Sequence, residues 1–337
     1  MILIENDNCT DPFINLAIEE YTFRNLIEND VFLFLYINDP SIIIGRNQNP
    51  FIEVNPRFLY NQEIPIVRRI SGGGTVFHDH GNISFSFIRK FESNLFNNYR
   101  EFTRPIIETL ADLGVIAVLD ERNNIRIEGR KISGNAQFTS KNKMLSHGTI
   151  LFSTELSTLH EALSEIIISI RSKSTPSISS EVTNVSEHTK PDINIHEFKL
   201  RLIKKIMQTE IPRRVNFTNQ QWNEIHKLAD SKYRTWEWNY GETPPFSYSK
   251  KIIIRNKETI IDVEVIDGVI SSIATADDIH FDYLMILNSF IGCKFREVDI
   301  FEVIEEYGRK IPSSMNQTEL LKLFDYLPRV KERISNQ

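Results

Sequence analysis

The sequence contains 337 residues, of which 41% are hydrophobic and 25% charged, and its formal net charge is −6. That composition is typical of a globular protein, and the negative charge argues against nucleic acid as a bulk partner. No apolar run approaches the length of a membrane span, and Cys9 and Cys293 lack metal-ligand spacing, so neither a membrane protein nor a disulfide or zinc framework is indicated. The first residues show no secretory or organellar leader, so we expect a cytoplasmic protein, with a mitochondrial location as the alternative if a leader was removed.

The first half of the chain is predicted to hold more strands than helices. Apolar residues recur at helical spacing from about Asp11 to Ile27 and from Tyr99 to Leu113, where Gly114 is placed as a C-terminal stop. Because helices do not alternate regularly with strands, the pattern favours an α+β fold, with helices mainly on one face of the sheet, over a doubly wound parallel sheet. Branched and aromatic residues predict strands at 31–37, 41–44, 64–70, 75–79, 83–88, 125–127 and 148–152.

The second half is predicted to end in a small separate domain. Residues 169–186, rich in Ser, Thr, Lys and Pro, predict a long loop. The Pro244-Pro245 step is predicted to separate a domain of residues 1–243 from a small α+β domain of residues 246–337. The other elements expected in this half are an amphipathic helix at 195–206, a β-hairpin-like pair at 251–255 and 259–266, and helices around 283–291 and 316–323.

The most informative stretch of the sequence is a glycine-rich loop at residues 68–79, which reads Arg-Arg-Ile-Ser-Gly-Gly-Gly-Thr-Val-Phe-His-Asp. Three glycines let backbone N–H groups lie against a ligand, and the arginines Arg68 and Arg69 add positive charge, so the loop predicts an anion site. The alternative is a mobile hairpin turn. A dinucleotide or P-loop motif is excluded, because the glycines run into strand-forming residues where those motifs require a helix.

Two histidines follow the glycines. Alternation along a strand predicts that His78 and His80 lie on the same side, yet no third ligand stands at a recognisable spacing, so the pattern does not favour a metal site. A serine-hydrolase triad is not favoured either, because the sequence lacks a Gly-Xaa-Ser-Xaa-Gly elbow.

Two charged residues elsewhere have competing interpretations. The predicted first helix is apolar on two faces, so Glu20 is either a buried functional acid or a boundary residue bonded to backbone. Lys131 stands between a turn at Gly129 and the small residues Ser133-Gly134, which suits an ammonium that faces a pocket and contacts phosphate or acyl oxygens. Its alternative is an ordinary surface lysine.

These motifs together resemble the lipoate–protein ligase A and lipoyltransferase family of the biotin/lipoate ligase superfamily. The resemblance rests on the glycine-rich loop, on Arg-Lys-Ile-Ser-Gly-Asn-Ala at 130–136 and on Ser-His-Gly-Thr-Ile-Leu-Phe at 146–152. The runs at 15–20, 44–50 and 236–241 match as well, so the resemblance covers nearly the whole chain in order.

The resemblance implies a large catalytic domain like that of biotin and lipoyl ligases, with a mixed sheet and flanking helices, and a small C-terminal domain. It implies activation of lipoate with ATP and Mg²⁺ to lipoyl-AMP, followed by transfer to a lysine of a lipoyl carrier domain, either in 2-oxoacid dehydrogenase complexes or in the glycine cleavage H protein. Lys131 would be catalytic. The adenylate would contact Arg69, Gly74, Thr75, Val76, Phe77 and Lys131, and the lipoyl group would contact Glu20, Arg69, Ser71, Gly72, Gly73, His78, Ser133 and His147.

Two departures from the family pattern bear on the activation step. Asn124 stands where the family usually has an Asp linked to Mg²⁺, and an amide in place of a carboxylate weakens a hard-cation site. The segment 177–184 carries Glu181 and lacks the two arginines that are usual there, which disfavours ATP more than a preformed adenylate.

The sequence therefore leaves several activities open. The leading interpretation is an ATP-dependent lipoate–protein ligase, and the alternative is a lipoyltransferase that uses preformed lipoyl-AMP. A cysteine-thioester octanoyl or lipoyl transferase is less favoured, because neither Cys9 nor Cys293 lies near the glycine-rich loop or Lys131 in the sequence. A non-catalytic binding module is the remaining alternative.

Overall fold

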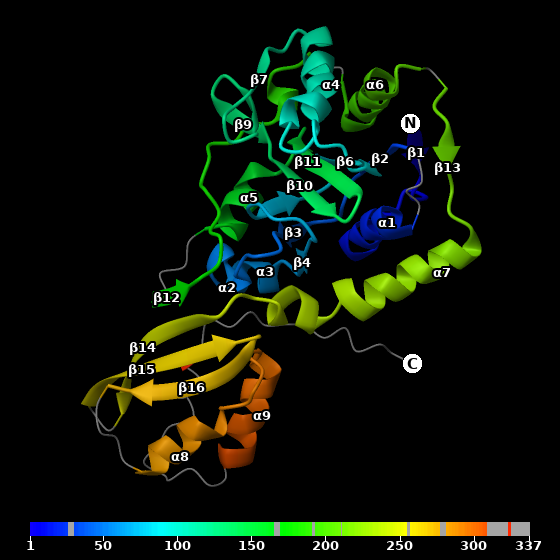
Figure 1. Ribbon diagram of the computed structural model, residues 1–337. Helices are drawn as coiled ribbons and strands as arrows, with labels where there is room; N and C mark the ends of the chain where they lie inside the picture. The colour runs from blue at the N-terminus through cyan, green and yellow to red at the C-terminus, as the bar shows by residue number, and fades with distance from the viewer. Residues whose placement is uncertain are drawn as a thin grey trace. The chain divides into compact units, whose positions relative to one another are not determined.

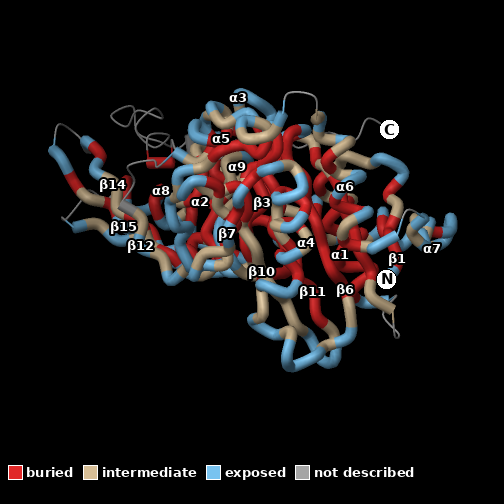
Figure 2. Tube along the Cα trace, turned by 90° about the horizontal axis from the view of Figure 1, so that it is seen from above, coloured by how far each residue is buried: buried red, intermediate tan, exposed pale blue. Residues whose placement is uncertain are grey.

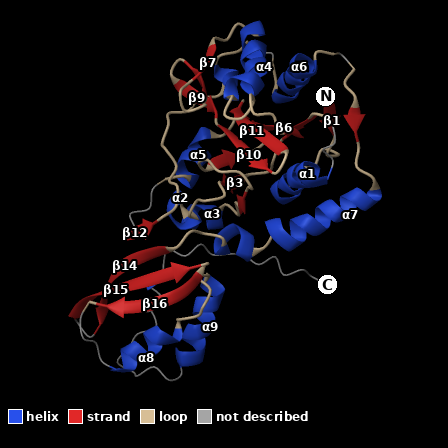
Figure 3. Ribbon diagram, viewed as in Figure 1, coloured by secondary structure: helices blue, strands red, loops and turns tan. Residues whose placement is uncertain are grey.

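The computed structural model describes residues 1–25, 30–164, 169–190, 193–209, 211–254, 257–276, 281–308 and 323–324. The chain divides into two compact units. The first comprises Met1–Arg46, Pro65–Leu159 and Ser177–Thr235, and the second comprises Asn47–Ile64, His160–Pro176 and Trp236–Gln337. Both units combine strands with helices, which confirms the α+β prediction (Figure 3). The predicted functional domains, residues 1–243 and 246–337, stay a prediction beside this division by packing.

A mixed sheet is the framework of the first unit. Among the described residues six strands follow the order β10-β11-β6-β2-β1-β13, with β1 parallel to both its neighbours and the other pairs antiparallel (Figure 1). The strands are β1 (Ile2–Ile4), β2 (Phe32–Tyr36), β6 (Asn82–Lys90), β10 (Asn135–Ser140), β11 (Lys143–Leu151) and β13 (Arg214–Val215). The strands β6 and β11, predicted at 83–88 and 148–152, are both longer than the sequence indicated.

Helices cover the sheet on one face with a large apolar core. The helices α4 (Tyr99–Asp112) and α6 (Ile195–Met207) confirm the predictions at 99–113 and 195–206, and Gly114 follows α4 with φ +79°. Burial of such side chains stabilises the fold by about 2 kcal/mol each. The core residues on this face include Leu33, Leu35, Phe85, Phe87, Phe102, Ile106, Leu110, Phe198, Leu202 and Ile206.

The opposite residues of the same strands face α1 (Pro12–Asn25). Successive side chains of a strand point to opposite faces, so Ser86, which pairs with His147 on β11, lies on the α1 face, whereas Phe87 lies on the α4 face. Asp11 begins α1 by accepting hydrogen bonds from the backbone N–H groups of Phe13 at 2.8 Å and Ile14 at 3.2 Å. The helix predicted from Asp11 to Ile27 is confirmed up to Asn25, and residues 26 and 27 lie outside the described part.

Two small sheets complete the first unit and carry the predicted site. One has the order β4-β3-β5 and the other β7-β8-β9. Their strands are β3 (Ser41–Ile44), β4 (Ile66–Arg68), β5 (Val76–His78), β7 (Ala117–Leu119), β8 (Ile125–Ile127) and β9 (Arg130–Ser133). The glycine-rich loop joins β4 to β5 and is a strand-loop-strand connection, as predicted. Outside the sheets, the unit also contains η1 (Val185–Glu187), α7 (Asn219–Leu228) and η2 (Ala229–Tyr233).

The second unit has its own antiparallel sheet, in the order β12-β14-β15-β16. The predicted hairpin at 251–255 and 259–266 is confirmed by β14 (Phe246–Ile254) and β15 (Lys257–Ile266). The prediction of one continuous loop over 169–186 is wrong, because β12 (Ser169–Ser172) pairs with β14, a contact between distant residues that local composition does not reveal. The remaining elements are α2 (Pro50–Glu53), α3 (Pro56–Asn61), η3 (Glu237–Gly241), β16 (Val269–Thr275), α8 (Phe281–Ser289) and α9 (Glu297–Gly308), while α5 (Leu156–Ala162) spans the division between the units.

The main sheet and the glycine-rich loop differ in burial. The strands β6 and β11 are buried along most of their length (Figure 2). The glycines Gly73 and Gly74 are exposed. The helix predicted at 283–291 corresponds to α8, and the one predicted around 316–323 lies outside the described residues except for its last position. In the described part of the chain, no helix has both the length and the apolar character to cross a membrane.

Candidate functional site

The glycine-rich loop folds around the side chain of Arg69. Its Nη2 donates to the carbonyl oxygens of Gly72 at 2.7 Å and Gly74 at 2.8 Å, and its Nη1 donates to the carbonyl of Ile43 at 3.1 Å. The Nε donates to Ser71 Oγ at 3.0 Å. Most of the guanidinium donors of this buried side chain are therefore occupied by the protein itself.

The neighbouring arginine has the same structural character. Arg68 is fully buried, and its Nη1 donates to the carbonyl oxygens of Gly45 at 3.2 Å and Arg46 at 3.1 Å. Burial lowers the pKa of Arg69 to about 10, against the opposing effect of the Glu19 and Tyr36 side chains, so the group remains a cation at neutral pH. Both arginines thus shape the loop, and the adenylate contact predicted for Arg69 stays a prediction.

The loop conformation requires two glycines, Gly73 within the loop and Gly45 packed against it. Gly73 has φ +93°, a conformation that L side chains rarely adopt, and a Cβ on Gly45 would lie 2.1 Å from the Gly73 carbonyl oxygen. The Gly72 carbonyl points to Arg69. In a trans peptide the N–H lies opposite the C=O, so the N–H of Gly73 points away from the guanidinium. This geometry fits an amide donor directed at a ligand.

A buried hydrogen-bonded array links the loop to the main sheet. Ser71 Oγ lies 2.6 Å from His147 Nε2, and His147 Nδ1 lies 3.0 Å from Glu19 Oε1. Because a carboxylate only accepts, Nδ1 carries the ring proton, so Nε2 accepts from the Ser71 hydroxyl. The sequence disfavoured a serine triad, and the array nevertheless has that connectivity. Ser71 is fully buried, so its hydroxyl is held in place and not exposed as a nucleophile.

The sequence pattern indicates Glu20 as the functional acid, whereas the structure places Glu19 in this array. The two acids are adjacent on α1 and point to different partners. Glu19 also accepts a hydrogen bond from Ser86 on β6. Glu20 is paired with Lys232 Nζ at 2.7 Å, with the Tyr233 hydroxyl at 2.5 Å and with Arg24. Since α1 is apolar on two faces, its sequence periodicity gave no signal for choosing between them, and the lipoyl contact predicted for Glu20 stays a prediction.

Lys131 lies on β9, where its ammonium is partly buried. A Cβ on Gly134 would lie 3.0 Å from Lys131 Nζ, so the small residue leaves room for the ammonium. Burial lowers the pKa of Lys131, the positive charge of Arg126 lowers it further, and Asp120 opposes both. Within the described residues the ammonium makes no hydrogen bond or ion pair with the protein, in contrast to Arg69. Its donors are therefore available to a ligand.

The segment 177–184, which we call the bridging segment, connects the loop to Lys131. Ser177 Oγ accepts a hydrogen bond from the backbone N–H of Thr75 at 2.9 Å. Further along, the backbone N–H of Lys131 donates to the Glu181 carbonyl at 2.8 Å, and the N–H of Thr183 donates to the Lys131 carbonyl at 3.1 Å. The segment that departs from the family pattern therefore lies directly against both predicted ligand-binding elements.

Asn124 stands near Lys131 and is bound to a carboxylate. Its Nδ2 donates to Asp120 Oδ2 at 3.1 Å, and Arg126 Nε donates to the same oxygen at 2.6 Å. Burial alone would raise the pKa of Asp120, but hydrogen bonds from Arg126, Asn124 and Arg122 hold it below its usual value. A magnesium ion prefers oxygen ligands with available lone pairs and octahedral geometry. A neutral amide beside a carboxylate already paired with Arg126 fits such an ion poorly, so we derive no step through it.

The remaining predicted site residues lie on the two small sheets. Ser133 is buried at the end of β9, where its Oγ accepts a hydrogen bond from Asn135 Nδ2 at 3.3 Å. The Asn135 Oδ1 is buried without a partner among the described residues. On β5, Val76 is half-buried and Phe77 is buried. Their backbone and side-chain contacts with an adenylate remain predictions.

The expectation that His78 and His80 share one side is wrong. His78 ends β5 and is buried, with Nδ1 2.9 Å from Asn38 Nδ2. His80 lies in the turn beyond the strand, where it is exposed and its Nε2 is 2.8 Å from Asp39 Oδ1. Alternation fails because the strand ends at His78, so the period of two does not extend to His80.

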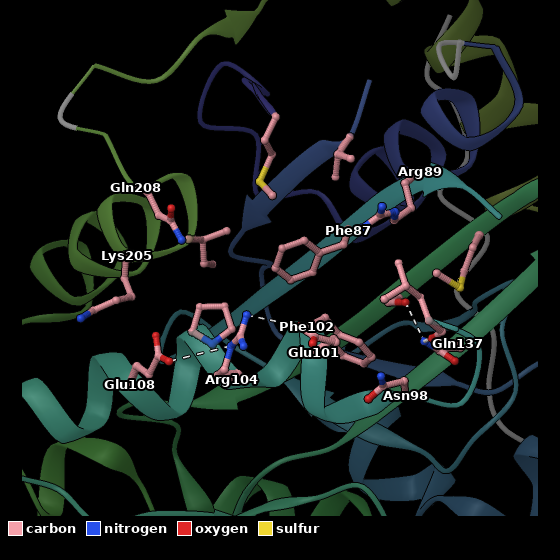
Figure 4. A pocket seen from close by; sticks show the side chains of 17 residues that line it. Phe87, Arg89, Asn98, Glu101, Phe102, Arg104, Glu108, Gln137, Lys205 and Gln208 are labelled. Carbon is pink, nitrogen blue, oxygen red and sulfur yellow. Dashed lines mark hydrogen bonds and ion pairs between the residues drawn. The ribbon is translucent and has the colours of Figure 1, made fainter. Parts of the chain in front are cut away.

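A pocket in the first unit lies away from this site, on the α4 face of the main sheet. Ser146, which lines it, neighbours His147 on β11 and therefore points to the opposite face. Figure 4 shows Arg104 of α4 between Glu101 and Glu108. Gln137 Nε2 donates a hydrogen bond to Ser146 Oγ at 2.9 Å. None of the residues predicted to bind adenylate or lipoate lines this pocket.

Neither cysteine thiol is activated as a nucleophile. Burial raises the pKa of the Cys9 thiol. Cys293 belongs to the second unit, and burial, with the charges of Asp299 and Glu302, raises its pKa to about 11. A thiol with a raised pKa is a poor nucleophile, because the thiolate is the reactive species.

Comparison with known proteins identifies the family. Residues 11–207 match the lipoyl protein ligase A/B catalytic domain. The chain is 39% identical to lipoate–protein ligase 1 of Staphylococcus aureus, over 91% of this chain and 94% of that protein. The crystal structure of lipoate-protein ligase A bound with ATP is 27% identical, with a TM-score of 0.61, over 72% of this chain and 98% of that one.

A second solved structure has a similar fold. The bipartite lipoate protein ligase of Thermoplasma acidophilum, studied with its E2 lipoyl domain, is 27% identical, with a TM-score of 0.60, and the match covers 72% of this chain and 96% of that one. The resemblance seen in the sequence is thereby confirmed. This chain belongs to the lipoyl protein ligase A/B family.

Proposed function

We propose that this protein is an ATP-dependent lipoate–protein ligase. Lipoate reacts with ATP to give lipoyl-AMP and pyrophosphate, and the amine of an acceptor lysine then attacks the acyl carbonyl of the mixed anhydride. The new amide bond forms as the bond between the carbonyl carbon and the phosphate oxygen breaks, AMP leaves, and the amine gives up a proton. Support comes from the family membership and from relatives named lipoate–protein ligases, one of them solved with ATP bound.

The single observation that carries the proposal is the contrast between Lys131 and its surroundings. Its partly buried ammonium has no protein partner among the described residues, and the bridging segment joins it to Thr75 of the glycine-rich loop. An ammonium held there stabilises negative charge on the phosphate and on the acyl oxygen during transfer. Because the adenylate is already activated, positioning and charge stabilisation account for most of the second step.

We infer that the acceptor is a lipoyl domain of a 2-oxoacid dehydrogenase complex, with the glycine cleavage H protein as a further acceptor. The Thermoplasma relative, studied with its E2 lipoyl domain, supports the first acceptor. ATP and lipoate are the expected substrates, and Mg²⁺ is expected to enter with the triphosphate because Asp120, the carboxylate bound to Asn124, is already paired with Arg126. The proposed location is the cytoplasm, with mitochondria as the alternative.

A second candidate function is lipoyl transfer from preformed lipoyl-AMP, without activation of lipoate. Two observations favour it. Asn124 offers an amide in place of a carboxylate, and the bridging segment beside Lys131 contributes Glu181 and no cation. Each change weakens a site for Mg²⁺ and triphosphate more than one for a monoanionic adenylate.

One experiment separates these functions. The protein is incubated with a lipoyl domain and either lipoate plus Mg-ATP or synthetic lipoyl-AMP, and acceptor mass is measured. Modification under both conditions is the result expected of a ligase, and modification with lipoyl-AMP alone identifies a transferase. No modification under either condition contradicts both and leaves a binding module. Pretreatment with a thiol-blocking reagent should leave the reaction unchanged, since neither thiol is activated.

A further inference from the structure

A chain of three buried asparagines runs from Asn6, which follows β1, to His78, a predicted lipoyl contact. Asn6 Nδ2 lies 2.8 Å from Asn15 Oδ1, Asn15 Nδ2 lies 2.8 Å from Asn38 Oδ1, and Asn38 Nδ2 lies 2.9 Å from His78 Nδ1. All four side chains are buried, with Asn15 and Asn38 fully so. The chain therefore connects four side chains with no freedom to exchange partners with water.

The direction of every bond in this chain is set by one backbone carbonyl. The Cys9 carbonyl oxygen, which can only accept, receives hydrogen bonds from Asn6 Nδ2 and Asn15 Nδ2, each at 2.9 Å. These bonds fix which end of each amide is NH₂. Asn38 therefore accepts from Asn15 through its oxygen and turns its NH₂ group toward His78.

The tautomer of His78 follows. Since Asn38 donates to Nδ1, that nitrogen is unprotonated and the ring proton sits on Nε2. His78 is 2% exposed, and Nε2 is buried with no hydrogen-bond partner among the described residues. Burial lowers the pKa of His78 to about 3, and the positive charge of Arg69 acts in the same direction, so the ring stays neutral. His78 thus presents one N–H donor, in a fixed orientation, that has no acceptor among the described residues.

The unmet donor belongs to the predicted acyl-binding part of the site. Nε2 lies on the side of the ring away from Asn38, and Arg69, whose charge acts on the ring, is bound to Ser71, another predicted lipoyl contact. An acyl chain that contained only CH₂ groups would leave this donor without a partner, which is costly for a buried N–H group. An acyl group with an acceptor atom would satisfy it.

We propose that the His78 Nε2–H group, aimed by Asn38, selects acyl groups that carry a hydrogen-bond acceptor, such as the sulfur atoms of a dithiolane, over a plain alkyl chain. His78 is the specificity-determining residue, and Asn38 is a positioning residue. This inference rests on the proposed lipoyl function. It adds that the protein discriminates lipoyl from octanoyl substrates through one buried N–H group.

The test compares kcat/KM for lipoate and octanoate in a transfer assay with a lipoyl-domain acceptor. His78→Leu removes the donor, and we expect the lipoate-to-octanoate ratio to fall by about 10-fold. His78→Gln keeps an N–H donor and should retain most of the preference. Asn38→Asp keeps the shape and the bond from Asn15, but a carboxylate accepts the proton of Nδ1 and leaves Nε2 without one, so the ratio should fall as in His78→Leu.

A matched control and a spectroscopic reading keep the test independent of stability. Asn49→Asp makes the same exchange at another fully buried asparagine, whose oxygen caps α2 by accepting from Phe51 N–H, and it should leave the ratio unchanged. Long-range ¹H–¹⁵N spectra of the imidazoles should show an unprotonated Nδ1 and a protonated Nε2 at His78 in the wild type, and the reverse in Asn38→Asp.

The outcomes are distinguishable. A ratio that stays the same in His78→Leu, or a wild-type His78 protonated on Nδ1, overturns the inference while leaving lipoyl transfer intact. If the wild type transfers neither acyl group from either the free acid with ATP or the adenylate, the proposed function itself fails. The ¹⁵N spectra of the wild type then still test the asparagine chain.

Discussion

The glycine-rich loop and the hairpin of β8 and β9 both place cations beside glycines, and the structure uses those cations in opposite ways. In the loop, Arg69 donates to three carbonyl oxygens and to Ser71 Oγ. In the hairpin, Lys131 is partly buried beside Gly134 and makes no hydrogen bond to the protein among the described residues. A similar local composition therefore yields one structural cation and one that is available to a ligand.

The difference shows that charge alone does not identify an anion site. A buried guanidinium whose donors are occupied contributes long-range potential, but it offers few hydrogen bonds to a substrate. A lysine ammonium whose donors are free can stabilise the negative charge that develops on the substrate between the ground state and the transition state. The comparison predicts that substitutions at Lys131 affect catalysis, whereas substitutions at Arg69 affect stability first.

The largest expected effect is at Lys131. Lys131→Ala should lower the single-turnover rate of transfer from lipoyl-AMP by about 100-fold, as expected when one transition-state donor is lost. The free energy of unfolding should change little, because the ammonium has no partner among the described residues. Lys227→Ala, at an exposed position on α7, is the matched control. Near-normal transfer by Lys131→Ala would contradict the role assigned to this residue.

Arg69→Lys tests whether the hydrogen bonds of Arg69 stabilise the fold. The variant keeps the positive charge but cannot reproduce the planar fork, so at least two of the carbonyl oxygens of Ile43, Gly72 and Gly74 lose their donor. We expect a loss of about 2 kcal/mol in the free energy of unfolding, measured with urea. Arg104→Lys, at an exposed ion pair on α4, should cost less than about 0.5 kcal/mol. Equal stability of Arg69→Lys and wild type would show that only the charge matters.

The sequence predicted the elements better than their partners. The strand-loop-strand setting of the glycines follows from strand-forming residues on both sides, and Lys131 was identified because its neighbours are small. By contrast, Glu19 and Glu20 are adjacent on a helix that is apolar on two faces, so periodicity could not show which one reaches His147. The arrangement of Arg69 against carbonyl oxygens depends on contacts across the fold, which no local pattern encodes.

Gly134→Ala tests whether Gly134 leaves room for the Lys131 ammonium. The added methyl group would lie 3.0 Å from Lys131 Nζ and 3.2 Å from Cε, so the ammonium must move by a few tenths of an ångström. Because transfer depends on positioning, we expect the rate to fall by about 10-fold with little change in stability. Gly129→Ala has no close neighbour but φ +79°, so it should destabilise the protein by about 1 kcal/mol with a smaller effect on the rate. The reverse pattern would mean that Gly134 serves the backbone and not the ammonium.

The smallest expected effect is at Asn124, the residue that tests whether this site affects the use of Mg²⁺ with ATP. Asn124→Asp removes the NH₂ group that donates to Asp120 and places two carboxylates together, so the protein without magnesium should lose about 1 kcal/mol of stability.

A divalent cation relieves the repulsion between the two carboxylates of Asn124→Asp. Mg²⁺ should therefore raise the unfolding temperature of Asn124→Asp more than that of the wild type. The Mg²⁺ concentration needed for half-maximal adenylate formation should fall by about 3-fold, and transfer from lipoyl-AMP should be unchanged. If Mg²⁺ stabilises both proteins equally, residue 124 does not face the metal, and its amide offers no support for a transferase over a ligase.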